Sequence, residues 1–198
     1  MAATSAIRNG ILSQDIDQRS GWPDELCVLL REHPRDSWEG TRSSLAQFWI
    51  QKHNHMRRQS DALQSANKDY QSGKASPTHF GAWVAPRLQG FLAELHGHHQ
   101  IEDYHYFPSF KAADPRLAAG FDVLARDHEM LHEGIMNIVE TVNQFVATIR
   151  TEDESDADAR RHAADKYVEA SALMHARLYR HLEDEEDLII PIMLAQGD

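Results

Sequence analysis

The 198-residue sequence contains a single cysteine, Cys27, and no long run of apolar residues. One cysteine cannot form an internal disulfide, and it cannot build a thiolate metal site alone. No stretch reaches the roughly 18 consecutive apolar residues of a membrane-spanning helix. Residues 1–23 also lack the apolar run of a signal peptide. These absences predict a protein of the reducing cytoplasm.

Positive charge is scarce as well, since 20 Lys and Arg face 31 Asp and Glu, for a formal net charge of −11. An acidic surface repels phosphate groups, so neither nucleic acid nor an anionic membrane is an expected partner. Hydrophobic residues make up 41% of the chain, which is ordinary for a globular domain with one core. Histidine, in contrast, is abundant, with 13 copies. Because imidazole is the commonest side-chain metal ligand, the positions of these histidines bear directly on function.

Apolar residues recur at helical three-four spacing in long segments, and no strand pattern competes with them. Asp114 and Pro115 form a break in which Asp114 is the expected N-cap. The segments predict an all-α, antiparallel up-down-up-down four-helix bundle over residues 43–198. Residues 1–42 are an N-terminal extension with one short helix from Pro23 to about His33, and whether it covers the bundle, gates a site or mediates dimerisation stays open. The bundle helices are expected over about 43–70, 78–111, 115–150 and 159–194, with an acidic loop over 151–158.

Each predicted helix carries histidine or carboxylate on its apolar seam. In the first helix, for example, His53 falls between Trp49 and Met56 on a seam that starts at Leu45. Burying such groups without partners would cost several kcal/mol each, so they must satisfy one another, bind water or bind metal. In an up-down-up-down bundle they also fall at one level. The predicted metal ligands are His53, His98, Glu102, His128, His132, His181 and Glu185.

The chain also repeats part of this pattern. His98-x3-Glu102-x5-Pro108 reappears as His181-x3-Glu185-x5-Pro191. The i,i+4 spacing places histidine and carboxylate on one helical face, so that the histidine can bind one ion while the carboxylate bridges to a second. Imidazole and carboxylate without thiolate suit iron, manganese or zinc better than copper(I).

Some neighbouring residues are alternatives to the predicted ligands. His53 is preferred to His55, which lies off the seam, and helix phase favours Glu185 over Glu186. His98 is preferred to His99, whose counterpart in the repeat is Leu182. A ferritin-like reading uses the Glu-x-x-His elements Glu102-x2-His105 and Glu129-x2-His132. It leaves the seam histidines unused, and the last helix has no such element.

The segments around these histidines resemble the HHE pattern of the hemerythrin family. They are His98-His99-Gln100-Ile101-Glu102-Asp103 through Phe107-Pro108, Asp127-His128-Glu129-Met130-Leu131-His132, and His181 through Pro191. The resemblance covers about residues 43–194. It implies a four-helix bundle with a non-haem site of two iron ions that reversibly binds dioxygen. One iron would take His53 and His98 and keep an open position, the other would take His128, His132 and His181, and Glu102, Glu185 and an oxo or hydroxo ion would bridge them.

The first functional hypothesis is therefore a binding protein, a carrier, sensor or scavenger of dioxygen or nitric oxide. The second is a di-iron enzyme, either a peroxidase, a nitric oxide reductase or a ferroxidase. The third is iron handling or iron–sulfur repair through an unknown protein partner. The sequence leaves open whether the protein is an enzyme, and whether it forms a homodimer.

Overall fold

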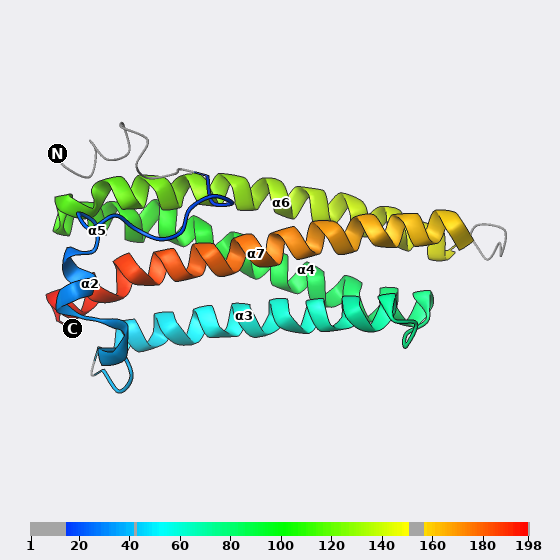
Figure 1. The fold of residues 1–198 in the computed structure, drawn as a ribbon, viewed down its shortest axis with the longest axis horizontal. Coiled ribbons are helices and arrows are strands. Elements are labelled where there is room, and N and C mark those ends of the chain that lie inside the picture. Colours follow the sequence, from blue (N-terminus) through cyan, green and yellow to red (C-terminus); the bar gives the residue numbers. More distant parts are fainter. Residues whose placement is uncertain (1–14, 42, 151–156, 198) are drawn as a thin grey trace. The chain divides into compact units, whose positions relative to one another are not determined.

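The computed structural model describes residues 15–41, 43–150 and 157–197, and none of these residues lies in a strand. The predicted all-α helical bundle is confirmed. No helix in the described part of the chain has both the length and the apolar character needed to cross a membrane. The helices are α2 (Val28–Glu32), α3 (Ser44–Gln71), α4 (Pro77–Ile101), α5 (Phe107–Ala113), α6 (Ala118–Arg150) and α7 (Ala157–Gln196), with the shorter turns η1 (Arg35–Ser37), η2 (Glu102–Tyr106) and η3 (Pro115–Leu117) (Figure 1).

The chain divides into two compact units, and each long helix takes part in both. The first unit comprises residues 1–55, 98–129 and 177–198, and the second comprises residues 56–97 and 130–176. Along the chain, α3 and α6 pass from the first unit to the second, whereas α4 and α7 pass from the second to the first. The antiparallel order itself stays a prediction. The domain boundary expected at residue 42 falls inside the first unit.

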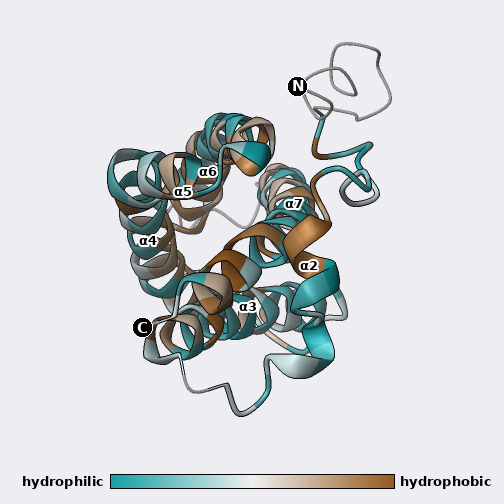
Figure 2. Cartoon of the chain, turned by 90° about the vertical axis from the view of Figure 1, so that its left-hand side faces the viewer, coloured by the Kyte–Doolittle hydropathy of each residue, from teal (hydrophilic) through white to brown (hydrophobic). Residues whose placement is uncertain are grey.

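The core of the first unit includes residues of the N-terminal segment as well as of the long helices. Helix α2 carries hydrophobic residues (Figure 2), and its Leu29 is buried in the same cluster as Phe121 of α6 and Leu188 of α7. Leu26 and Trp38, on either side of α2, belong to that cluster too. Full burial of such a side chain stabilises the fold by about 1.5–3 kcal/mol. The N-terminal segment is thus part of this core.

The second unit has an aromatic core to which all four of its helical segments contribute. Tyr70 of α3 stacks on Phe80 of α4, with ring centroids 4.5 Å apart. Phe145 of α6 and Tyr167 of α7 lie 5.6 and 6.1 Å from the Phe80 ring. Offset and edge contacts of this kind add to the stabilisation from burial.

Two predicted features of the helices differ in the structure. Leu45 is 37% exposed, and Ala46 is buried in its place, so the seam of α3 begins one residue later. A small side chain at position 46 fits the interior beside Trp49. The second predicted helix is interrupted, because η2 is a π-helix between α4 and α5.

The structure confirms one predicted chain break, shortens the N-terminal helix and leaves most of the predicted acidic loop undescribed. Asp114 is confirmed as an N-cap, since its carboxylate accepts a hydrogen bond from the Arg116 backbone amide at the start of η3. The N-terminal helix is shorter than predicted, because residues 24–26 form a turn and α2 begins only at Val28. The predicted acidic loop lies outside the described residues except at Ala157 and Asp158, which already belong to α7.

Candidate metal centre

Four side chains of the first unit converge from four helical elements. His53 comes from α3, His98 from the last turn of α4, Glu102 from the start of η2 and Glu185 from α7. Their ligand atoms all lie within 4.8 Å of one another. The Nε2 atoms of His53 and His98 are 3.2 Å apart. We call these residues the two-histidine group.

Three buried imidazoles form a second cluster in the same unit. His99 of α4, His128 of α6 and His181 of α7 also have ligand atoms within 4.8 Å of one another. The Nε2 atoms of His128 and His181 are 3.2 Å apart, and the rings of His99 and His128 are stacked with centroids 4.0 Å apart. We call these residues the three-histidine group.

Glu102 reaches both groups. Its Oε1 lies 2.8 Å from Nε2 of His98, and its Oε2 lies 3.5 Å from Nε2 of His128. The sequence accounts for this position, because Glu102 follows His98 by four residues and His99 by three, and both spacings place side chains on one helical face. One carboxylate therefore faces one imidazole of each group.

Glu185 is arranged in the same way from α7. Its Oε1 lies 3.6 Å from Nε2 of His53, and its Oε2 lies 3.2 Å from Nε2 of His181. The indole N–H of Trp49 donates a hydrogen bond to Oε1, with a donor–acceptor distance of 3.0 Å. Each of the two carboxylates thus faces one histidine of the two-histidine group and one of the three-histidine group.

Other carboxylates fix the outer nitrogens of two ligand imidazoles. Nδ1 of His53 is 3.0 Å from Oε1 of Glu186, and Nδ1 of His128 is 2.8 Å from Oδ1 of Asp103. An ionised carboxylate only accepts hydrogen bonds, so each Nδ1 carries the proton and each Nε2 presents its lone pair to the centre. Metal-binding histidines commonly have such partners. The neighbouring residues Glu185 and Glu186 therefore occupy different places, one inside the centre and one behind His53.

Burial sets the protonation of the centre. It lowers the pKa of His98 to about 3, so this ring is neutral and can act as a ligand at neutral pH. Burial and then the neighbouring Glu185 carboxylate raise the pKa of Glu102 well above its usual range. Burial also opposes the charge on His181, but Asp127 and Glu185 outweigh it and raise the pKa of His181 to about 9. Two adjacent buried carboxylates are costly unless positive charge lies between them.

The polar atoms of the centre fit bound cations better than they fit one another. The oxygens of the fully buried Glu102 face only imidazole nitrogens and the Glu185 carboxylate, and Nε2 of the buried His99 has no hydrogen-bond partner among the described residues. Oxygen and nitrogen lone pairs instead converge on one region. Imidazole and carboxylate donors without thiolate suit iron, manganese or zinc. Each of the two groups therefore offers a set of donors that could hold a divalent metal ion.

The π-helix η2 lies next to the centre and begins at Glu102. A π-turn holds one more residue than an α-turn, and such insertions are frequent at functional sites. Beyond it, Phe107 is buried with its ring centroid 5.3 Å from that of His128. The His98–Glu102 spacing indicated two candidate ligands on one helical face, but it carried no sign of the π-turn that follows them.

The structure brings together most of the predicted ligands and adds one. His53, His98, Glu102 and Glu185 share one group, and His128 and His181 share the other. His99 completes the three-histidine group, whereas the exposed His132 has its ring 5.3 Å from that of His96. The adjacent pair His98-His99 was the available signal for a ligand to each ion. It was set aside because the repeat has Leu182 at that point.

The ferritin-like alternative finds no comparable cluster. Its residues His105 and Glu129 are exposed, as is His132, and only Glu102 of that set lies in a buried group of potential ligands among the described residues.

Comparison with known proteins agrees with this geometry. The family model "Hemerythrin HHE cation binding domain" matches residues 44–193, which is most of the chain and contains every residue of both histidine groups. No curated protein and no solved structure matches the chain. The chain belongs to the hemerythrin family, as a member with an HHE cation-binding domain.

Proposed function

We propose that the protein holds two iron ions at this centre and reversibly binds dioxygen or a related diatomic molecule such as nitric oxide. The observation that carries the proposal is the unequal division of ligands. One group supplies two imidazoles and the other three, while Glu102 and Glu185 serve both. The ion of the two-histidine group is one protein ligand short of its neighbour, which leaves room for a diatomic there.

Iron is the metal that connects this site to diatomic chemistry. Ferrous iron can donate electrons to a diatomic molecule that binds it, whereas zinc has no redox chemistry. The chain supplies neutral imidazoles, because burial lowers the pKa of His98 and His128. It also supplies only two carboxylates within the ligand groups. A centre with fewer anionic ligands stabilises oxidised iron less, which favours reversible binding over lasting oxidation.

Aromatic side chains form a wall beside the two-histidine group. The Trp49 ring centroid lies 6.2 Å from that of His53 and 6.0 Å from that of His98. Tyr106 packs edge-on against Trp49, with centroids 4.6 Å apart. Such a wall keeps water from the group and slows loss of a bound diatomic. The side chain of His98 is 9% exposed, whereas those of His53, Glu102 and Glu185 are fully buried, so His98 is the most exposed residue of the group.

The test is the iron content and optical spectrum of protein purified without added metal, reduced anaerobically and then exposed to air. We expect two irons per chain, with charge-transfer bands that appear in air and vanish on removal of oxygen. His53→Ala should abolish these bands, whereas His55→Ala, which alters an exposed histidine outside both groups, should leave them.

Two other results would contradict the proposal in different ways. Two irons that oxidise in air and stay oxidised would favour an enzyme or a nitric oxide-specific role. A chain that carries no iron, or one zinc ion, would remove the di-iron centre and leave a helical bundle with a buried polar cluster.

A further inference from the structure

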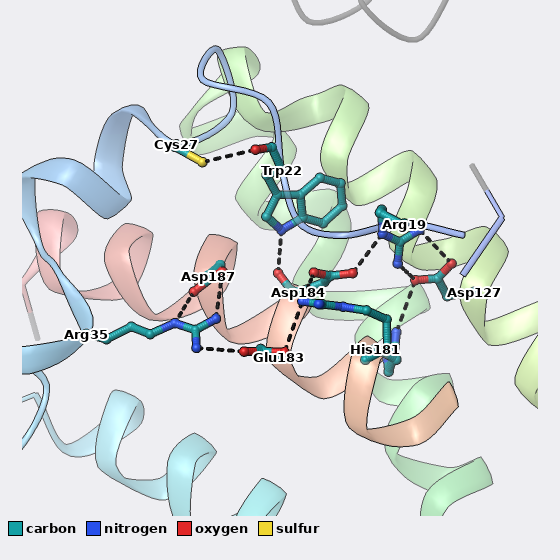
Figure 3. Close-up of polar contacts among 10 residues, drawn as sticks. Arg19, Trp22, Cys27, Arg35, Asp127, His181, Glu183, Asp184 and Asp187 are labelled. Carbon is teal, nitrogen blue, oxygen red and sulfur yellow. Dashed lines mark hydrogen bonds and ion pairs between the residues drawn. The ribbon is translucent and has the colours of Figure 1, made fainter. Parts of the chain in front are cut away.

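An arginine of the N-terminal segment lies buried beside the centre. The Arg19 side chain has no exposed surface and lies between Asp127 of α6 and Asp184 of α7, which are equally covered (Figure 3). Its Nε donates to Oδ2 of Asp184 at 2.7 Å, and its Nη1 donates to Oδ1 of Asp127 at 3.2 Å. Its Nη2 makes a further short contact with Oδ2 of Asp127. One guanidinium therefore joins two buried carboxylates.

Asp127 connects this arginine to a ligand of the three-histidine group. Its Oδ2, the atom that receives Nη2 of Arg19, lies 3.5 Å from Nδ1 of His181 (Figure 3). The equivalent carboxylates behind the other ligands are partly exposed, with 35% of the Asp103 side chain and 13% of the Glu186 side chain accessible. Asp127 has no such access to water, so its charge requires a partner, and Arg19 provides it.

The backbone around Arg19 is held on both sides. Before it, Asp17 accepts two hydrogen bonds from Arg177 of α7, at 2.9 and 2.6 Å. After it, the indole N–H of Trp22 donates to the backbone oxygen of Asp184 at 2.7 Å, and the Arg19 guanidinium lies 5.2 Å from the Trp22 ring (Figure 3). These contacts fix the segment at the point where Arg19 enters the interior.

We infer that Arg19 is a positioning residue for the ion bound by the three-histidine group, acting through Asp127 on His181. The inference rests on the two-ion centre of the proposed function. A carboxylate held against Nδ1 fixes the ring and directs Nε2 to the metal. Arg19 holds Asp127 by both oxygens, so it fixes the carboxylate that faces the ring. The family model matches from residue 44 onward, so Arg19, which supports this centre, lies outside the matched domain.

The guanidinium fork is what this role requires. Arginine reaches two carboxylates with nitrogens in fixed directions, whereas the lysine ammonium is a compact charge on a flexible chain. Arg19→Lys keeps the buried charge but loses the double contact with Asp127. Disturbing the outer partner of a ligand typically weakens metal binding about 10–100-fold. We expect that loss for one ion and an unchanged affinity for the other.

Arg35 offers a matched control in the same N-terminal segment. It also joins two carboxylates of α7, with Nε 2.7 Å from Oδ1 of Asp187 and Nη1 2.9 Å from Oε1 of Glu183 (Figure 3). Neither Asp187 nor Glu183 belongs to either group of potential ligands in the described part of the chain. Arg35→Lys should therefore disturb the attachment of the segment without weakening either ion.

The experiment is titration of the metal-free full chain with Co²⁺, followed by visible absorption, which reports the coordination of each bound ion. The unaltered protein and Arg35→Lys should show two tight binding steps, and Arg19→Lys should show one tight and one weakened step with altered bands. Equal weakening in the two lysine variants, or two unchanged steps in Arg19→Lys, would overturn the positioning role. Fewer than two ions on the unaltered protein would instead overturn the proposed centre itself, and this inference with it.

A second variant covers the case in which Arg19→Lys does not fold, as judged by its helical circular dichroism. Asp127→Asn keeps the size of the side chain and an oxygen that accepts from Arg19, but it removes the charge that faces His181. We expect it to weaken the same single ion. Two unchanged binding steps in Asp127→Asn would overturn the inference.

Discussion

Replacement of His99 by leucine should separate metal binding from the stability of the fold. His99 is 5% exposed, its ring stacks on His128, and its Nε2 has no hydrogen-bond partner among the described residues. A buried polar atom without a partner costs about 1–3 kcal/mol. Leucine removes that cost at similar volume, and Leu182 already occupies the corresponding position of the repeat. The metal-free variant should therefore be as stable as the unaltered protein or more stable.

With metal bound, the His99→Leu variant should instead be less stable than the unaltered protein. A ligand that binds only the folded state stabilises it by about 4.1 kcal/mol at 1,000 times its Kd. For a chain of this size, each kcal/mol raises Tm by roughly 2–4 °C, so the ion of the three-histidine group should raise Tm by roughly 8–16 °C. His99→Leu should lose most of that increase, because it removes one of three imidazoles.

The assay is thermal unfolding by circular dichroism, with chelator and with saturating Fe²⁺ under anaerobic conditions, together with metal analysis. The matched variant is His132→Leu, which alters an exposed histidine beside His96 and should keep the full increase in Tm. The reasoning fails if His132→Leu loses the metal-dependent increase while His99→Leu retains it. His132 would then be the third imidazole, as the family resemblance implies.

Further predictions concern the packing and titration of the chain. Gly120→Ala should destabilise the fold by about 1–3 kcal/mol in urea unfolding, because the new Cβ would lie 2.5 Å from Cδ1 of the buried Leu188. Gly90→Ala, on an open helix surface, should stabilise it by about 0.5–1 kcal/mol, and equal effects of the two changes would contradict the packing. Burial raises the pKa of the Cys27 thiol, so a maleimide should modify it more slowly than a free cysteine at pH 7, and faster labelling would refute the burial. Burial lowers the pKa of His98 in the folded state to about 3, so below about pH 6.5 the unfolded chain binds more protons than the folded chain. The metal-free protein should therefore lose stability on the order of 1 kcal/mol per pH unit as the pH falls from 6.5 toward 3. His98→Leu should flatten that slope.

The clustering of most seam histidines and glutamates was predictable because its signal is local and repeated. Histidine at i and glutamate at i+4 share a helical face whatever the rest of the fold does. The repeat of that pair at His98 and His181 indicated two equivalent helices, and the structure indeed brings Glu102 and Glu185 to both groups of histidines. The N-cap at Asp114 follows from equally local chemistry.

Features that depend on tertiary packing left no such local sign. The choice of Ala46 over Leu45 for the interior depends on the space beside Trp49, and both residues suit a helix equally. The π-turn of η2 has no counterpart in the helical periodicity of the sequence, which runs through it unbroken. Arg19 was hidden for a related reason, because the segment around it has no periodic apolar pattern and is held by polar contacts to α6 and α7.

The use of both His98 and His99 explains how a repeated sequence forms an unequal centre. Neighbouring residues of an α-helix point about 100° apart, so one turn of α4 can present an imidazole to each of two adjacent ions. At the corresponding turn of α7, His181 is followed by the fully buried Leu182, which has no ligand atom. α4 therefore contributes two imidazoles, and α3, α6 and α7 contribute one each. The repeat accounts for the paired carboxylates, and its departure at Leu182 leaves one ion position a ligand short, where we propose that the diatomic binds.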